Sequence, residues 1–245
     1  MRKINLICLF IAAVALSCAV HPPMALEDIE YIRQARDYQQ QEKYKDAREE
    51  YQKVLENHPG SKYMAEARLG IADSYFNNKE YIEAVAKYDE FLKYYPRNPL
   101  AEQAEFRLAM SHYNQRLEID RDQSETRKTI EAFEKLTKDF PQSPLNDETQ
   151  KHLMECHTLL AEHEIYIGRF YLRREDYYSA ISRFKHVLTH YQQTAIMDKA
   201  LFGLAESYQG LGKYRESYIL YEQLLAAYPQ SQYAPEAKGR MAQCR

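Results

Sequence analysis

The chain has 245 residues, of which 45% are hydrophobic and 28% are charged, and its formal net charge is −3. Only 7 residues are Gly, too few for the many turns of an all-β fold, so helices are expected. The mild negative charge argues against a nucleic-acid partner, which would require a basic surface. The 22 Tyr residues, with no Trp, suit shallow helical layers in which a ring packs and its hydroxyl stays wet.

Residues 1–17 have the layout of a secretory signal. Arg2 and Lys3 precede an unbroken apolar run from Leu6 to Leu16. This run is too short to span a bilayer as a helix. We therefore expect residues 1–17 to be removed from the mature chain.

The end of this signal, Ala15-Leu16-Ser17-Cys18, resembles the lipobox of bacterial lipoproteins. The resemblance implies cleavage before Cys18 and lipidation of Cys18, with residues 18–26 as a tether. Several acyl chains would form a stable membrane anchor. Residue 19 is Ala and not Asp. In the bacterial sorting rule that this resembles, a lipoprotein without Asp at this position travels on to the outer membrane. The alternative is an ordinary cleavable signal followed by a chance Cys.

One eleven-residue pattern recurs along the chain and marks the joints between predicted helices. Each intact copy has an aromatic residue or His before Pro, and Pro disfavours helix in the residue before it. Two residues later comes a good N-cap (Ser61, Asn98, Ser143 or Ser231), and Pro99 and Pro144 suit the first position of the next helix. The copies are NHPGSKYMAEA (57–67), YYPRNPLAEQA (94–104), DFPQSPLNDET (139–149), AYPQSQYAPEA (227–237) and the diverged HYQQTAIMDKA (190–200).

The segments between the joints share small residues at fixed places. Residues 69–96 and 202–229 align without a gap and match Gly70 with Gly203 and Ala72 with Ala205. Small residues let two helices approach closely, and the pattern resembles the tetratricopeptide repeat. We expect an all-α, right-handed α-solenoid of about five such helix pairs. Repeats 1–3 would occupy residues 27–140, and repeats 4–5 with a C-terminal capping helix would occupy residues 141–245.

The two middle repeats are longer than the family unit of about 34 residues. An insertion, QRLEIDRDQSETR, covers residues 115–127, and the first helix of the fourth repeat extends from about Asn146 to Arg174. Insertions in a solenoid often map to loops on a binding face.

No catalytic or phosphate-binding motif is present, so we expect a protein that is not an enzyme and that uses no cofactor. The nearest approach to a metal site is His152, Cys156 and His163 on one helix, but a structural zinc site needs four ligands. We interpret these three residues, like His186 and His190, as surface or packed side chains. An exported protein could pair Cys156 with Cys244, but spacing alone leaves that disulfide open.

A closer resemblance covers nearly the whole mature chain. Cys18, the repeats, the DRDQ segment (residues 120–123) ahead of TIEAFEKLTKDFPQSPL, and LLAEHEIYIGRFYLRREDYYSAISRFKHVL together resemble the BamD family of outer-membrane assembly lipoproteins. The resemblance implies a lipid-anchored scaffold on the periplasmic face of the outer membrane. Its expected partners are the POTRA domains of BamA, other Bam lipoproteins and unfolded β-barrel clients. Gln192 departs from the repeat pattern, which has Pro there.

The same resemblance implies two sets of site residues. Arg183 is carried over as the BamA contact, with Phe184 beside it as a core aromatic, and Arg183 as an ordinary solvated side chain is the alternative. The first repeats, from Glu27 to about Lys93, would receive clients in a tyrosine-lined groove. The second hypothesis is another tetratricopeptide lipoprotein, such as a secretin pilotin or a cell-division coordinator. The alternative from a different functional class is an enzyme on a helical scaffold. The predicted residues are Asp120, Arg121, Asp122, Gln123 and Arg183 for partners and Tyr31, Tyr38 and Tyr75 for clients.

Overall fold

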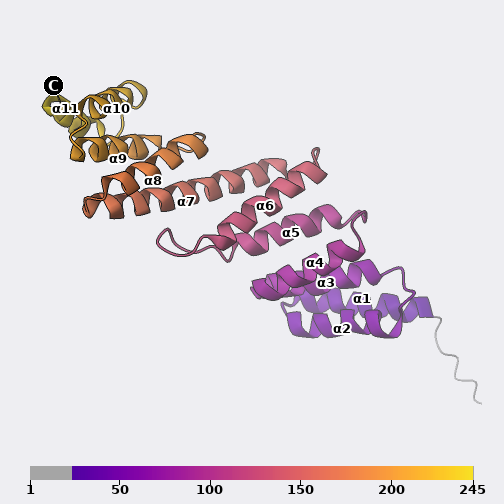
Figure 1. The fold of residues 1–245 in the computed structure, drawn as a ribbon. Helices are drawn as coiled ribbons and strands as arrows, with labels where there is room; N and C mark the ends of the chain where they lie inside the picture. Colours follow the sequence, from indigo (N-terminus) through magenta and orange to yellow (C-terminus); the bar gives the residue numbers. More distant parts are fainter. Residues whose placement is uncertain (1–23, 245) are drawn as a thin grey trace, which may run out of the picture.

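The computed structural model describes residues 24–244, and this part of the chain consists of α-helices joined by turns and loops, with no strand (Figure 1). The predicted signal, Cys18 and residues 18–23 of the predicted tether lie outside the described residues. The helices are α1 (Met24–Gln40), α2 (Tyr44–Asn57), α3 (Met64–Asn77), α4 (Tyr81–Tyr94), α5 (Ala101–Tyr113), α6 (Ser124–Asp139), α7 (Asn146–Arg173), α8 (Tyr177–His190), α9 (Met197–Gly210), α10 (Tyr214–Ala227) and α11 (Ala234–Gln243).

These helices stack in chain order as antiparallel pairs. Each helix packs chiefly on the next, from α1 on α2 to α10 on α11, so the described chain forms an elongated array (Figure 1). The predicted all-α solenoid of five pairs with a single terminal helix is confirmed. The first helix begins at Met24, ahead of the predicted start of the first repeat at Glu27.

The joints end the helices where the Pro residues predict. α2 ends at Asn57, before His58-Pro59, and α4 ends at Tyr94, before Tyr95-Pro96. The diverged copy also stops its helix, because α8 ends at His190 although Gln192 replaces Pro.

The predicted N-caps are displaced from the helix starts. Ser61 Oγ accepts from the N–H of Tyr63 at 3.1 Å, and the N–H of Met64 donates to Ser61 O at 3.3 Å. The polar side chain therefore caps a turn that precedes the helix, so the helix begins after that turn. The other three intact joints repeat this geometry, and Pro99 and Pro144 likewise precede α5 and α7 instead of opening them.

Small residues are required where helix pairs meet, as the repeat pattern predicts. A Cβ atom on Gly203 of α9 would lie 2.4 Å from the ring of Phe184 on α8, and one on Gly70 of α3 would lie 2.3 Å from the ring of Tyr51 on α2. Ala72 and Ala205 are fully buried. An aromatic ring from one repeat therefore fills the space above a small residue of the next.

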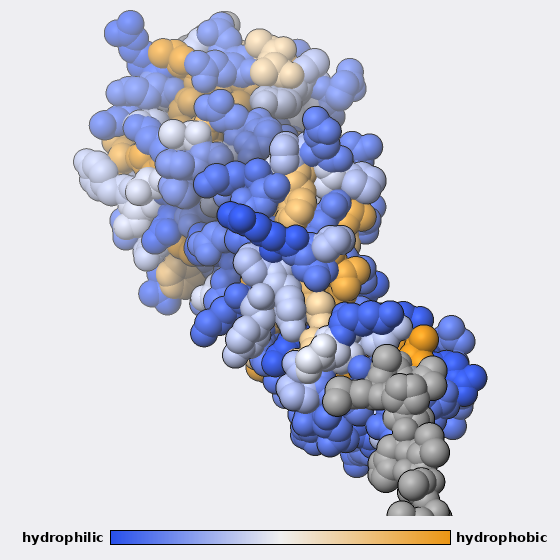
Figure 2. All heavy atoms as spheres, turned by 90° about the vertical axis from the view of Figure 1, so that its right-hand side faces the viewer, coloured by the Kyte–Doolittle hydropathy of each residue, from blue (hydrophilic) through white to orange (hydrophobic). Residues whose placement is uncertain are grey.

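The core divides into four local clusters along the array. They lie in α1–α3, in α3–α5, in α5–α9 and in α9–α11, and the largest contains Phe133, Leu136, Phe184 and Val187. Each repeat thus depends on its immediate neighbours, as expected for a solenoid. The side of the molecule shown in Figure 2 is mostly hydrophilic, with apolar residues in small separate groups. No helix among residues 24–244 is long and apolar enough to cross a membrane.

The middle of the array departs from the regular stacking. α7 has 28 residues, and the connection between α5 and α6 is a long loop, residues 114–123 (Figure 1). The predicted insertion is shorter as a loop than residues 115–127, because Ser124–Arg127 form the first turn of α6. First helices of successive repeats touch at α1 and α3, at α3 and α5, and at α7 and α9, whereas α5 reaches α7 chiefly through Tyr113 at its end.

Candidate partner-binding site

Arg183 lies on α8 and is bound to a buried carboxylate of α7. Its Nη1 lies 3.0 Å from Glu164 Oε2, and the side chains are 41% and 10% exposed respectively. Arg183 is therefore half exposed, with one part of its guanidinium engaged inside the protein. The remaining N–H groups can donate to a second carboxylate, because a guanidinium has five N–H groups in a fork.

Phe184, the next residue, faces the core. Its ring is fully buried between Gly168 of α7 and Gly203 of α9. This anchor fixes the rotation of α8 about its axis and so holds Arg183 at the edge of the α7–α8 interface.

The DRDQ segment closes the α5–α6 loop and is internally braced. Gln123 is 3% exposed, and its Nε2 donates to Glu118 O at 2.8 Å and to Arg121 O at 3.1 Å. Its Oε1 accepts from Thr126 Oγ1 at 2.8 Å. Asp120, Arg121 and Asp122 are exposed. A partner contact through this segment therefore falls to those three residues, with Gln123 holding the loop.

Asp122 also helps to begin α6. Its Oδ1 accepts from the N–H of Ser124 at 2.9 Å. Hydrogen bonds from Ser124, aided by the charges of Arg127 and His163, hold the pKa of the Asp122 carboxyl below its usual value. The loop therefore presents a fixed negative charge at neutral pH.

One turn of α7 contacts both the loop and Arg183. His163 Nδ1 lies 2.6 Å from Ile119 O in the loop, and the next residue, Glu164, holds Arg183. Tyr191 lies near the same place, and burial raises the pKa of its hydroxyl, with Arg127 opposing and Glu164 adding to the shift. Residues from α6, α7, α8 and the loop thus form one cluster, although they are distant in sequence.

Of the three predicted client tyrosines, Tyr75 lines a hollow of the first two repeats, and Tyr31 and Tyr38 pack beside the core. Tyr75 of α3 lines a hollow of about 600 Å³ between α2 and α4, together with Arg48, Lys53 and Lys87. The guanidinium of Arg48 stacks 4.2 Å from the Tyr75 ring. Tyr31 and Tyr38 are partly buried against the α1–α3 core cluster and are not among the lining residues of this hollow.

The residues weighed as a metal site have other partners. The His152 ring stacks on Phe133, Cys156 is buried with Arg116 Nη1 3.6 Å from its Sγ, and His163 contacts the loop. No group of three possible ligands is assembled within residues 24–244. Cys156 and Cys244 are free thiols in different core clusters, so they are not paired.

This arrangement defines a class of protein: an all-helical solenoid of tetratricopeptide-type helix pairs. The TPR2AB domain of yeast Sti1, solved in complex with pHSP90, matches the fold with a TM-score of 0.50 and 13% sequence identity. That match covers 89% of this chain and 82% of the other. It supports the fold alone.

Sequence comparison identifies the family. The model of the YfiO family, described as outer membrane lipoprotein, matches residues 24–218. The chain is 33% identical over 191 residues to the outer membrane protein assembly factor BamD of Rickettsia prowazekii, covering 78% of this chain and 76% of the relative. BamD of Vibrio cholerae is 33% identical over 93 residues, covering 38% and 39% respectively. The chain therefore belongs to the YfiO family of outer membrane lipoproteins. Neither relative is named as an enzyme, in agreement with the predicted scaffold.

Two features of the site were not found from the sequence. Glu164 follows Leu160 and Ala161 on the buried face of α7, and a carboxylate at a core position must find a cation, so the helical period could have indicated a buried ion pair. The packing of the loop on α7 left no such signal, because it depends on one backbone carbonyl, Ile119 O, meeting His163.

Proposed function

We propose that this chain is a lipid-anchored scaffold of the outer-membrane β-barrel assembly machinery. It is tethered through Cys18 to the periplasmic face of the outer membrane, binds the POTRA domains of BamA together with other Bam lipoproteins, and assists the insertion of unfolded β-barrel proteins. Membership of the YfiO family and the Rickettsia relative, whose name is that of an assembly factor, support this function.

The observation that carries the proposal is the cluster around one turn of α7. Arg183 is held at 3.0 Å by Glu164, and the neighbouring residue His163 contacts a braced loop with exposed Asp120, Arg121 and Asp122. An arginine with free N–H groups can bind a carboxylate of BamA in a charge-assisted, bidentate pair. The loop belongs to the third repeat but packs on the fourth, so the BamA surface draws on both sides of residue 140.

The client surface lies in the first two repeats. The hollow beside Tyr75 is lined by that one aromatic ring, by basic side chains that include Arg48, Lys53 and Lys87, and by the acidic Glu49 and Glu56. Mixed charges with a stacked aromatic suit extended segments of variable sequence, which offer backbone groups and alternating side chains. Tyr31 and Tyr38 support the wall of this region through the α1–α3 core.

Co-purification of BamA with tagged variants from detergent-solubilised outer membrane tests the proposal. Arg183→Lys keeps a cation beside Glu164 but loses the planar fork, so BamA capture should fall while the fold is retained. Arg215→Lys, an exposed site on α10, is the matched control and should capture BamA like the wild type.

Two results would contradict the proposal. If the wild-type chain recovers a secretin or a division protein and no BamA, the chain serves another lipoprotein pathway. If Arg183→Lys and Arg183→Ala both retain BamA fully, the contact does not involve Arg183.

A further inference from the structure

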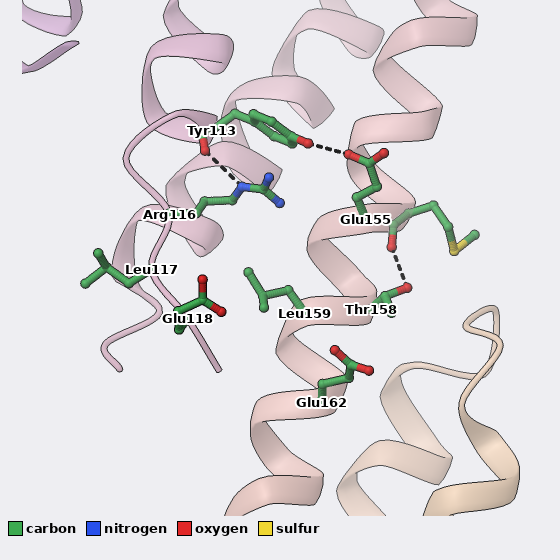
Figure 3. A pocket seen from close by; sticks show the side chains of 9 residues that line it. Tyr113, Arg116, Leu117, Glu118, Glu155, Thr158, Leu159 and Glu162 are labelled. Atoms are coloured by element: carbon green, nitrogen blue, oxygen red, sulfur yellow. Dashed lines mark hydrogen bonds between the residues drawn. The ribbon is translucent and has the colours of Figure 1, made fainter. Parts of the chain in front are cut away.

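A groove of about 490 Å³ lies between the α5–α6 loop and α7 (Figure 3). It exists because α5 reaches α7 chiefly through Tyr113 at its end, so beyond that point the loop instead of a helix covers this side of α7. One wall is formed by the loop, including Leu117 and Glu118, and the other by α7, including Leu159 and Glu162.

The walls of the groove are ordered by contacts behind them. The guanidinium of Arg116 lies 3.4 Å from the centre of the Tyr113 ring, and its Nε donates to Tyr113 O at 2.9 Å. The hydroxyl of Tyr113 donates to Glu155 on α7. These bonds, drawn in Figure 3, join the loop to Tyr113 at the end of α5 and join Tyr113 to α7, so the groove is present before any partner arrives.

The groove exposes apolar side chains on both walls. Leu117 is 49% exposed and Met154 is 41% exposed, and Leu159 is partly buried between the loop and α7. The helical spacing continues this face from Glu162 to Tyr166, which is also 41% exposed. Apolar side chains gathered in a groove with a polar rim are typical of a protein-binding surface.

The charge of the groove is negative. Its lining has three carboxylates, Glu118, Glu155 and Glu162, and a single basic residue, Arg116, which is engaged with Tyr113 and Cys156. A hydrogen bond from Tyr113 lowers the pKa of the Glu155 carboxyl, so Glu155 is ionised at neutral pH. Glu162 is bridged by Lys199 at 3.3 Å, whereas Glu118 takes part in none of the ion pairs within residues 24–244.

We propose that this groove is a docking site for a short segment of a partner protein in which an apolar residue stands next to Lys or Arg. The apolar side chain would cover Leu117, Met154 and Leu159, and the cation would lie against Glu118 and its neighbouring carboxylates. The hollow is open along one side, which suits a peptide segment better than an enclosed small molecule. The inference rests on the proposed scaffold function, but it concerns a contact separate from Arg183.

Fluorescence anisotropy with labelled hexapeptides and the full-length lipoprotein in detergent tests the site. The probe is a peptide of alternating Leu and Lys, compared with one of alternating Leu and Glu and one of alternating Ser and Lys. Binding of the Leu/Lys peptide to empty micelles is subtracted. The Leu/Lys peptide should bind saturably, and each comparison peptide should bind at least tenfold more weakly, because each lacks one of the two recognised features.

Exposed substitutions localise the binding. Met154→Lys and Glu118→Lys change the groove without disturbing the core, so each should weaken the Leu/Lys peptide at least tenfold. Ile82→Lys on α4, an apolar residue that is 73% exposed, and Glu131→Lys on α6 are matched controls and should leave the affinity unchanged. Circular dichroism of every variant should match the wild type.

The outcomes separate this inference from the proposed function. The groove proposal is contradicted if Met154→Lys binds the Leu/Lys peptide as tightly as the wild type, or if the wild type binds the Leu/Glu peptide as tightly as the Leu/Lys peptide. This holds even if Arg183→Lys still fails to capture BamA. Loss of Leu/Lys peptide binding in Met154→Lys and Glu118→Lys supports the groove proposal, including the case in which BamA capture proves independent of Arg183.

Discussion

Arg183 and Glu164 form an ion pair that joins α8 to α7 at 3.0 Å, with the carboxylate largely buried and the guanidinium half exposed. The pair therefore has an inner half that belongs to the fold and an outer half that is open to a partner. The sequence alone predicts a freely solvated or partner-facing Arg183, whose replacement would leave the fold intact. The buried partner changes that expectation.

Arg183→Glu should lower stability as well as BamA binding. The substitution places a second carboxylate beside buried Glu164, and breaking a buried pair on one side leaves a charge without compensation. Because Arg183 is half exposed, we expect a loss of about 1–3 kcal/mol in the free energy of unfolding. Urea denaturation of purified protein measures it.

A double-mutant cycle separates the two effects. Arg183→Gln combined with Glu164→Gln removes both charges, so its stability should be higher than the sum of the single losses predicts. Its BamA capture should stay low, because the outer donors of the guanidinium are gone. Strictly additive stabilities would show that the pair contributes nothing to the fold.

Gly203→Ala should destabilise the interface between the fourth and fifth repeats. The added Cβ would lie 2.4 Å from the Phe184 ring, which is fully buried and cannot move freely. Overpacking of this kind costs about 1–3 kcal/mol. Gly239→Ala in α11 meets no atom within 4 Å and should raise stability by about 0.5–1 kcal/mol through helix propensity. Thermal melts that shift in the same direction for both variants would contradict this packing.

The regular parts of the fold were predictable because local chemistry determines them. Pro after His58 or Tyr95 stops a helix whatever lies around it, and Gly70 and Gly203 recur because a ring must fit above each of them. The helix starts predicted from the sequence were too early. A Ser or Asn side chain makes the same kind of hydrogen bond when it caps a turn as when it caps a helix, so Ser61 does not reveal which of the two follows.

The candidate site was less predictable because its contacts join distant residues. His163 and Ile119 are far apart in sequence, and nothing in the spacing of either indicates their 2.6 Å contact. Likewise, Tyr38 and Tyr75 share a residue type and a place in the repeat, but Tyr75 lines the hollow, whereas Tyr38 is partly buried against the α1–α3 core cluster and is not among the lining residues.

Asp73→Asn should change how stability depends on pH. Burial raises the pKa of the Asp73 carboxyl above its ordinary value of 3.8, although Tyr88 Oη donates to it at 2.6 Å. As the pH rises above that ordinary value, the unfolded carboxyl ionises while the folded one keeps its proton, so this residue makes the wild type lose stability. The asparagine does not ionise, so the variant does not lose stability in this way, and its side-chain oxygen still accepts a hydrogen bond from the Tyr88 hydroxyl. Melting temperatures from pH 3 to pH 7 should show the variant gaining on the wild type as pH rises, and a constant difference would contradict the shift.

Cys18→Ser tests the proposed anchor. If cleavage precedes a lipidated Cys18, the variant should accumulate as an uncleaved or soluble form, because it lacks the acyl chains that hold the protein in a membrane. Fractionation of outer membrane and soluble material, followed by mass spectrometry of the N-terminus, measures both outcomes. Cys156→Ser, a change at a buried free thiol, serves as the control and should remain membrane-bound. Mature Cys18→Ser protein in the outer membrane would disprove lipid anchoring at Cys18.

Gln123→Ala should loosen the α5–α6 loop without removing any exposed partner group. The buried amide of Gln123 satisfies Glu118 O, Arg121 O and the hydroxyl of Thr126, and their loss should cost about 1–3 kcal/mol. An arginine-specific protease should then cut at Arg121 faster than in the wild type, whereas exposed Asp120→Ala should leave the rate unchanged. If BamA capture falls with Gln123→Ala, the partner requires the ordered loop, because the Gln123 side chain is too buried to touch it. A cleavage rate equal to the wild type would mean that other contacts, such as His163 with Ile119, are sufficient to order the loop.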